Sequence, residues 1–255
     1  MHIARPAAVP ARPACALPFV VRPATGPEDL AEAAWMRAEA YGRHLPAFAA
    51  GLRTIEAADR SPGTLVLLAR SKDDGRPVGT VRLHIDRERP LPIEASVHLP
   101  AWLSDAGPLI EPTRLGVEAS ACGALARTAL LKACHLHATA LGAAWIVAAA
   151  RRPLDRMYRG LLFRDVFDGG PPLPMRHIGD LPHRVMALPV RELRAMSESR
   201  RHPLHAFFFE TTHPDLVVED IESCTAVASR PAAGIGGREG PGRVERFPEP
   251  ITGQV

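Results

Sequence analysis

A chain of 255 residues, 46% of them hydrophobic and 23% charged, has the composition of an ordinary globular protein, and its length suits one sizeable domain. The net charge of +3 is too small to indicate nucleic acid as a partner, and no apolar run approaches the roughly 20 residues that cross a bilayer. The four cysteines show no paired spacing, so we expect no disulfide framework and a reducing, cytoplasmic location.

The two ends of the chain differ in composition from its middle. Residues 1–18 are rich in Ala and Pro and lack the apolar centre of a signal peptide, so we expect a flexible N-terminal arm. Residues 221–255 are rich in Gly, Pro and charged residues, which is typical of a disordered tail. One folded domain is therefore predicted over residues 19–220.

The first half of this domain is predicted to contain a strand, a helix and a hairpin. Residues 19–25 are typical of a short strand, and residues 26–45 have the acidic start and apolar spacing of a helix. Strands are predicted at 64–70 and 77–85, joined through an Asp-Gly turn. The proline-rich residues 87–110 are predicted to be an irregular insert.

The second half alternates strands with helices. A strand over 111–118 precedes an Ala/Leu-rich helix over 123–141, and the unbroken apolar run 144–150 is typical of a central strand covered on both faces. The remaining elements are a short helix at 153–161, strands at 163–167 and 183–190, and terminal helices at 191–200 and 202–212.

This order of elements resembles the GNAT acyltransferase superfamily. The resemblance implies an α/β fold with a mixed, mostly antiparallel sheet flanked by helices. Its fourth and fifth strands, here 111–118 and 144–150, are expected to splay apart and to leave a slot for the thioester of the acyl donor.

The loop after the fourth strand indicates the kind of donor. In members that use acetyl-CoA, a pattern Arg/Gln-x-x-Gly-x-Gly/Ala and the following helix N-terminus hold the pyrophosphate. In "VEASACGALARTALL" only Gly123 matches a family glycine, while Leu125 and Arg127 stand where small residues are expected. This departure favours a donor with a pantetheine arm but no nucleotide, namely an acyl carrier protein, over coenzyme A.

Over roughly residues 19–190 the chain is similar to FeeM-like N-acyl amino acid synthases and to acyl-homoserine-lactone (autoinducer) synthases. Those families carry an arginine and an aromatic in the first helix, two acids three apart, an arginine in a later strand, and a Glu-x-x-Arg pair opening the next. The matching residues are Arg37, Tyr41, Glu56, Asp59, Arg82, Glu111 and Arg114. The stretch "GRHLPAF" stands where autoinducer synthases place a tryptophan, which favours the amino-acid-acylating branch.

Acyl transfer from a thioester to an amine needs a neutral amine, a stabilised oxyanion and a proton for the departing thiolate. The resemblance implies that Tyr158 protonates the thiolate; the alternative is a tyrosine packed between a helix and the sheet. Glu111 is a candidate general base, directly or through water, but a structural or orienting ion pair with Arg114 or Arg82 is favoured. Backbone N–H groups near Leu115–Val117 are expected to polarise the thioester carbonyl.

The arginines admit two roles each. Arg37, Arg82 and Arg114 can bind the acceptor's carboxylate or neutralise the neighbouring acids, and we favour charge balancing for most of them. The short helix region is expected to dock an acidic carrier protein, with a solvated basic face as the alternative. Its arginines are Arg151, Arg152, Arg156, Arg159 and Arg164.

No metal site is predicted. Cys122, Cys134, His135 and His137 lack ligand spacing, and cysteine as a small core residue is the favoured interpretation. The apolar cluster at 205–216 is expected to complete the core, with an acyl-chain cover as the alternative.

Together these features predict a monomeric N-acyltransferase with no permanently bound cofactor. Its co-substrate is the acyl-phosphopantetheine of acyl carrier protein, or acyl-CoA, and its acceptor is an amino acid or related small amine. Two alternatives remain open: an acetyl-CoA-dependent acetyltransferase, and a non-catalytic binding or regulatory protein of the same fold.

Overall fold

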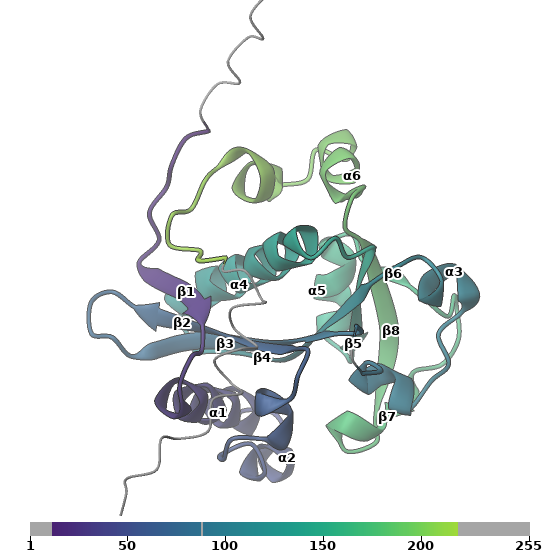
Figure 1. Ribbon diagram of the computed structural model, residues 1–255, viewed down its shortest axis with the longest axis horizontal. Helices are drawn as coiled ribbons and strands as arrows, with labels where there is room; N and C mark the ends of the chain where they lie inside the picture. The colour runs from purple at the N-terminus through teal and green to yellow at the C-terminus, as the bar shows by residue number, and fades with distance from the viewer. Residues whose placement is uncertain (1–11, 88, 219–255) are drawn as a thin grey trace, which may run out of the picture.

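The computed structural model describes residues 12–87 and 89–218, and Figure 1 shows a central sheet with helices on both of its faces. The strands, in chain order, are β1 (Phe19–Pro23), β2 (Thr64–Ser71), β3 (Pro77–Ile85), β4 (Leu109–Val117), β5 (Trp145–Ala150), β6 (Arg164–Asp165), β7 (Leu173–Met175) and β8 (Leu181–Pro189). The α-helices are α1 (Pro27–Gly42), α2 (Pro46–Ala50), α3 (Ala101–Ser104), α4 (Ala121–Ala140), α5 (Leu154–Gly160) and α6 (Leu193–Ser199). The 3-10 and π turns are η1 (Ala57–Arg60), η2 (Pro92–Ala95), η3 (Arg176–Ile178) and η4 (Ala206–Glu210).

The sheet has the order β1-β2-β3-β4-β5-β8-β6, and β7 pairs with β8. All these pairings are antiparallel except β4 with β5, which is parallel. β4 and β5 pair only through Leu109–Trp145 and Ile110–Ile146, although β4 continues to Val117 and β5 to Ala150. The two strands therefore splay apart beyond their first residues, and the predicted fold class is confirmed.

Each face of the sheet is buried by different helices. Along β2, Leu67 belongs to the main core that includes α4, whereas Val66 and Leu68 pack with Ala33 of α1. This alternation follows from the two-residue period of a strand. Figure 1 accordingly shows α1 on one side of the sheet and α4 with α5 on the other. A sheet covered on both faces explains the almost unbroken apolar character of β2 and β5.

Helix α1 lies unusually close to β4. A Cβ atom placed on Gly116 would stand 3.0 Å from the Cβ of Ala40 and 3.4 Å from the Cα of Arg37. The small residues along this contact bring the helix backbone close to the sheet. As a result, Tyr41 of α1 reaches the cavity at the β4–β5 splay from one side.

The C-terminal segment is fixed to α4. The ammonium group of Lys132 donates hydrogen bonds of 2.7 Å to the carbonyls of Phe207 and Thr211, and Phe209 joins the main core. Residues 205–216 therefore pack as part of the core, as favoured from the sequence. Pro13 and Cys15 form backbone hydrogen bonds with Thr212, and the N–H of Leu17 donates to the carboxylate of Asp215. The rest of the predicted arm, and the predicted tail, lie outside the described residues.

The prolines of residues 87–110 led us to expect an irregular insert, but this segment has ordered turns and a buried side. It contains η2 and α3, and Leu91, Ile93 and Leu103 are buried in a second core cluster with Val147 of β5. Proline at the first position of η2 is compatible with a helical turn because the missing N–H has no intrahelical partner there. Helix α2 and strand β7 were likewise not expected from the sequence.

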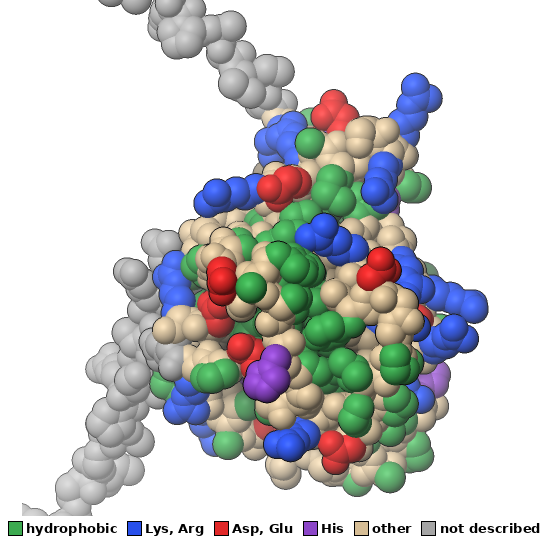
Figure 2. Space-filling view, turned by 90° about the vertical axis from the view of Figure 1, so that its right-hand side faces the viewer, with side chains coloured by type: hydrophobic (Ala, Val, Ile, Leu, Met, Phe, Trp, Pro, Cys, Tyr) green, Lys and Arg blue, Asp and Glu red, His purple; other side chains and the backbone are tan. Residues whose placement is uncertain are grey.

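The end of the molecule that carries α3 and β6 is shown in Figure 2. Hydrophobic side chains form a broad band across this face, and Lys and Arg lie mainly along its margins. Trp102 of α3 remains 44% exposed. The guanidinium of Arg164 lies 4.5 Å from the ring centroid of Trp102 and 4.5 Å from that of Trp145.

Within residues 12–87 and 89–218, no helix is both long and apolar enough to span a membrane.

Candidate active site

A cavity of about 380 Å³ lies where β4 and β5 diverge. Its wall brings together residues from α1, β4, the end of β5 and α5, which are widely separated in the sequence. The residues singled out from the sequence that line it are Tyr41, Glu111, Arg114, Leu115, Val117, Arg151, Arg152 and Tyr158. Arg156 and Arg159 are exposed and do not line it.

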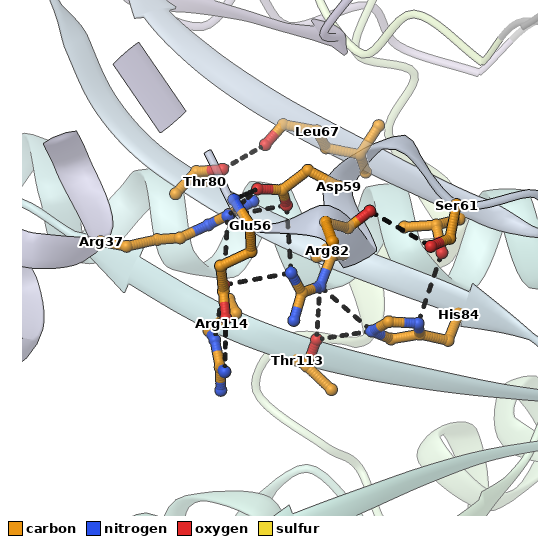
Figure 3. Close-up of polar contacts among 12 residues, drawn as sticks. Arg37, Glu56, Asp59, Ser61, Leu67, Thr80, Arg82, His84, Thr113 and Arg114 are labelled. Atoms are coloured by element: carbon orange, nitrogen blue, oxygen red, sulfur yellow. Dashed lines mark hydrogen bonds and ion pairs between the residues drawn. The ribbon is translucent and has the colours of Figure 1, made fainter. Parts of the chain in front are cut away.

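Beside the cavity, the other predicted residues form a buried network of ions (Figure 3). Arg37 donates to both carboxylate oxygens of Asp59, at 2.7 and 2.9 Å, and both side chains are fully shielded from solvent. Arg82 donates to Glu56 and to Asp59 at 3.1 Å each. Buried charges are tolerated only when they are paired in this way. Neither Arg37 nor Arg82 lines the cavity, so charge balancing is the role that their geometry supports.

Arg114 joins this network to the cavity wall. Its guanidinium binds Glu56 through two hydrogen bonds of 2.9 and 2.8 Å, and also donates to the carbonyl of His177 at 3.1 Å. Burial raises the pKa of Glu56, but the hydrogen bonds from Arg114 and the nearby charge of Arg82 outweigh it and lower the pKa to about 2. Arg114 is thus neutralised by Glu56.

β4 carries a bulge at Arg114. Thr113 pairs with Arg82 and Gly116 with Thr80, so the two residues Arg114 and Leu115 stand opposite the single residue between those partners. Arg114 has a φ of 55°, in the left-handed region that a residue with a side chain rarely adopts. A bulge leaves the extra residue outside the regular hydrogen-bond ladder. Leu115, Gly116 and Val117, which follow Arg114 in this irregular part of β4, line the cavity.

Glu111 is fully buried and does not pair with Arg114 or Arg82 in the described structure, so that predicted ion pair is wrong. One carboxylate oxygen accepts a 2.9 Å hydrogen bond from the N–H of Ile93, and the other lies 3.4 Å from Nε2 of His177. The arginines are instead satisfied by Glu56 and Asp59, which reach them from η1 and the residue before it. Burial raises the pKa of Glu111 to about 8. Its carboxyl group is therefore largely protonated at neutral pH.

Tyr158 projects from α5 to the cavity. Its ring packs edge-on against Phe163, with centroids 4.9 Å apart, and its side chain is almost fully buried. Burial raises the pKa of its hydroxyl above the ordinary value of 10.0. No described residue makes a hydrogen bond to this hydroxyl, so it remains available to a bound molecule.

Five basic residues that were not predicted as site residues also line the cavity: Arg43, His44, Arg127, His177 and His183. Burial lowers the pKa of His177 to about 4 and also lowers the pKa of His183, so these two imidazoles are neutral at neutral pH and the positive charge of the wall comes from its arginines. Glu111, largely protonated, is the carboxyl group among the described lining residues. The cavity therefore has a positive wall. The positions of His177 and His183 follow from strand pairing in the segment after α5, where the sequence has no recognisable motif.

The start of α4 is occupied by the chain's own groups. The hydroxyl of Ser120 accepts a 3.0 Å hydrogen bond from the N–H of Gly123, and the carboxylate of Glu118 bonds to the Ser120 hydroxyl and to Arg76. A phosphate group binds best to a helix N-terminus whose amides are free and whose surroundings carry no negative charge. This helix start therefore fits a pyrophosphate poorly.

No group of His, Cys, Asp and Glu with the geometry of a metal site occurs among the described residues. Cys134 is buried in the main core, as favoured from the sequence, and burial raises the pKa of its thiol.

Comparison with known proteins agrees with this geometry. The family model for the N-acyl amino acid synthase FeeM matches residues 32–175. The chain belongs to the FeeM family. The matched range includes all the residues on which the resemblance was based, and the resemblance is confirmed. Family membership makes the protein an acyltransferase.

Two solved structures share the fold of this FeeM-family protein. The structure of FeeM from uncultured soil microbes has a TM-score of 0.58 and 17% identity, and covers 74% of this chain and 96% of its own. The CoA-dependent acyl-homoserine lactone synthase BjaI with MTA has a TM-score of 0.50 and 16% identity, and covers 82% of this chain and 98% of its own. A comparison with curated protein sequences finds no match.

Proposed function

We propose that this FeeM-family protein joins a long-chain acyl group, delivered as an acyl carrier protein thioester, to the amine of an amino acid. The observation that carries the proposal is the cavity at the β4–β5 splay. It combines a strand bulge, a buried tyrosine hydroxyl and a positive wall in one place. Leu115, Val117 and Ile178 add apolar surface suited to an acyl chain.

In this proposal the thioester lies along β4. The neutral amine attacks the thioester carbon, and backbone N–H groups near Leu115–Val117 stabilise the oxyanion that develops. The nitrogen loses a proton to water in the open cavity, the carbon–sulfur bond breaks, and Tyr158 gives its proton to the departing thiolate. Glu111 has an orienting role, because its carboxyl group accepts a hydrogen bond from the N–H of Ile93 and lies beside His177.

The start of α4 supports a carrier-protein donor. A coenzyme A donor would bring its pyrophosphate to the place where Ser120 caps the helix and the carboxylate of Glu118, paired with Arg76, bonds to that cap. A carrier protein presents its pantetheine arm without a nucleotide, so no pyrophosphate has to bind at the start of α4. Because BjaI is described as CoA-dependent, donor choice needs a direct comparison.

The rim beside α5 is the proposed docking surface for the carrier protein. Arg152, Arg156 and Arg159 are exposed there, and Leu154 between them is 45% exposed. Acidic partners are attracted by such a basic rim, and an apolar side chain at its centre adds buried contact.

The free cysteines Cys15, Cys122 and Cys134 support placing this reaction in the reducing cytoplasm.

Lipid extracts of cells that express the protein test the proposal. We expect a long-chain N-acyl amino acid in extracts from cells with the wild-type protein, and much less of it with Tyr158→Phe at equal protein level. Mass spectrometry of both extracts and of an empty-vector control measures the product. Identical extracts from all three would contradict the proposal, and an N-acetylated product alone would indicate an acetyl-CoA-dependent enzyme.

A further inference from the structure

Arg151 differs from the other arginines around the cavity. It follows the last residue of β5, its side chain is partly buried, and its Nη1 atom is shielded from solvent without a hydrogen-bond partner among the described residues. By contrast, Arg114 is held by Glu56, and Arg43 donates to the carbonyl of Val117 at 2.7 Å. Arg152 is exposed at the rim, and Arg127, although partly buried and without a described partner, has no nitrogen atom that is both shielded from solvent and unpaired.

The charge of Arg151 is not balanced by a described side chain. No described carboxylate lies within ion-pair distance of it, and Glu111, on the same cavity wall, is directed to Ile93 and is largely protonated at neutral pH. Partly buried guanidinium groups are ordinarily paired, because desolvating an unpaired charge is costly. An anion that enters the cavity would supply the missing partner.

The position of Arg151 indicates which anion this is. Arg151 lines the same cavity as Tyr158, the proposed proton donor, and is less exposed than Arg152. The phosphate of a pantetheine arm would first meet the groups nearer the start of α4, such as Arg127, or the exposed rim. An amino acid whose amine reaches the thioester must place its carboxylate close by, within the same cavity.

We infer that Arg151 is the residue that binds the free carboxylate of the amino-acid acceptor. A guanidinium can hold a carboxylate through two parallel N–H···O bonds, which fixes the orientation of the α-carbon and its amine. The protein would then select α-amino acids over amines that lack a carboxylate. This inference rests on the proposed function and assigns Arg151 to the acceptor rather than to carrier-protein docking.

Steady-state kinetics with an amino acid and with its α-carboxamide test the inference. We expect Arg151→Gln to raise KM for the amino acid about 10- to 100-fold, the loss typical of charge-assisted hydrogen bonds. KM for the carboxamide and KM for the acyl donor should stay at their wild-type values, so the preference for acid over amide disappears. Arg151→Lys keeps the charge but not the fork and should recover only part of this preference.

Arg152→Gln and Arg127→Gln are the matched variants, and we expect both to keep the wild-type preference for acid over amide. A raised KM for the donor in Arg151→Gln, with that preference intact, would overturn the inference and assign Arg151 to the carrier protein or its pantetheine phosphate. Calorimetric titration of each protein with the amino acid gives a second readout that needs no turnover. Wild-type protein that makes no acyl product would refute the proposed function, whereas equal amino-acid binding by wild-type and Arg151→Gln would refute only the inference.

Discussion

Among the buried ions beside the cavity, Asp59 is the carboxylate on which the pairing of the arginines depends most. Its carboxylate, fully shielded from solvent, receives hydrogen bonds from Arg37 of α1 and from Arg82 of β3. Glu56 also forms an ion pair with Arg82, and it forms a second ion pair with Arg114 at the bulge of β4. Through Arg114, this network of charges from α1, β3 and β4 reaches one wall of the cavity.

Asp59→Asn should destabilise the protein by about 3–5 kcal/mol, the cost of leaving a buried charge without its partner. Urea denaturation at neutral pH measures this change. Glu39→Gln is the control, because it removes the exposed contact with Arg53 and should change stability little. Equal stability of the two variants would show that the buried pair does not stabilise the fold.

Glu111 should make stability depend on pH. Its pKa is about 8 in the folded protein and has an ordinary value of 4.5. A carboxyl whose folded pKa is raised contributes stability fully below its unfolded pKa and loses that contribution as pH rises through its folded pKa. Wild-type protein should therefore lose stability relative to Glu111→Gln between about pH 5 and about pH 9. If the unfolding free energies of the wild-type protein and of Glu111→Gln changed in parallel with pH, the raised pKa of Glu111 would be contradicted.

Tyr158 and Glu111 should differ in their effects on turnover. Tyr158→Phe should lower kcat about 10²- to 10⁴-fold, as expected for loss of a proton donor, without unfolding the protein. Glu111→Gln keeps a group of the same shape beside Ile93 and should retain most of the wild-type kcat at neutral pH. A loss in Glu111→Gln as large as that in Tyr158→Phe would make Glu111 the base.

At the scale of the structural elements, α4 packs so closely against the loop before it that only glycine fits at position 123. A Cβ atom on Gly123 would lie 2.1 Å from the carbonyl oxygen of Glu118, which is backbone and cannot rotate away. Gly123→Ala should destabilise the protein by about 1–3 kcal/mol or more, the range for overpacking. Gly160→Ala, with open space at its Cβ, is the control, and unfolding in urea compares the two. A Gly123→Ala protein as stable as the control would mean that the loop adapts freely.

Elements with strong local patterns could be predicted from the sequence. The Asp-Gly hairpin, the long Ala/Leu-rich helix and the apolar strand β5 all occur where they were expected. β7, η3 and the ordered turns of residues 87–110 could not be predicted, because tertiary contacts set them. The N–H of Arg176 binds the side chain of Ser96, and Arg114 binds the carbonyl of His177, and neither contact leaves a periodic pattern.

The same division applies to the site residues. Tyr158 and the charged residues of the network could be named because they follow known family spacing. The partners of Glu111 could not be named, because Ile93 and His177 lie in segments without a motif. Arg151 was grouped with its exposed neighbours because sequence does not show which member of an arginine cluster is partly buried and unpaired.

At the scale of the whole molecule, the basic rim beside α5 should control the encounter with an acidic donor. The double variant Arg152→Glu and Arg156→Glu should lower kcat/KM for an acyl carrier protein thioester about tenfold or more at low salt, and less at high salt. Arg200→Glu changes an exposed charge of α6's C-terminal end and serves as the control. Stopped-flow or steady-state rates at two salt concentrations measure the effect. An equal loss in Arg200→Glu would indicate a general charge effect.

The most direct measurement supplies the purified protein with a mixture of amino acids and two competing donors of the same acyl length. The acyl group on carrier protein and the acyl group on coenzyme A carry different isotope labels, and mass spectrometry identifies the product. We predict an N-acyl amino acid that carries the label of the carrier protein. A product with the coenzyme A label, or no N-acyl amino acid at all, would contradict this account.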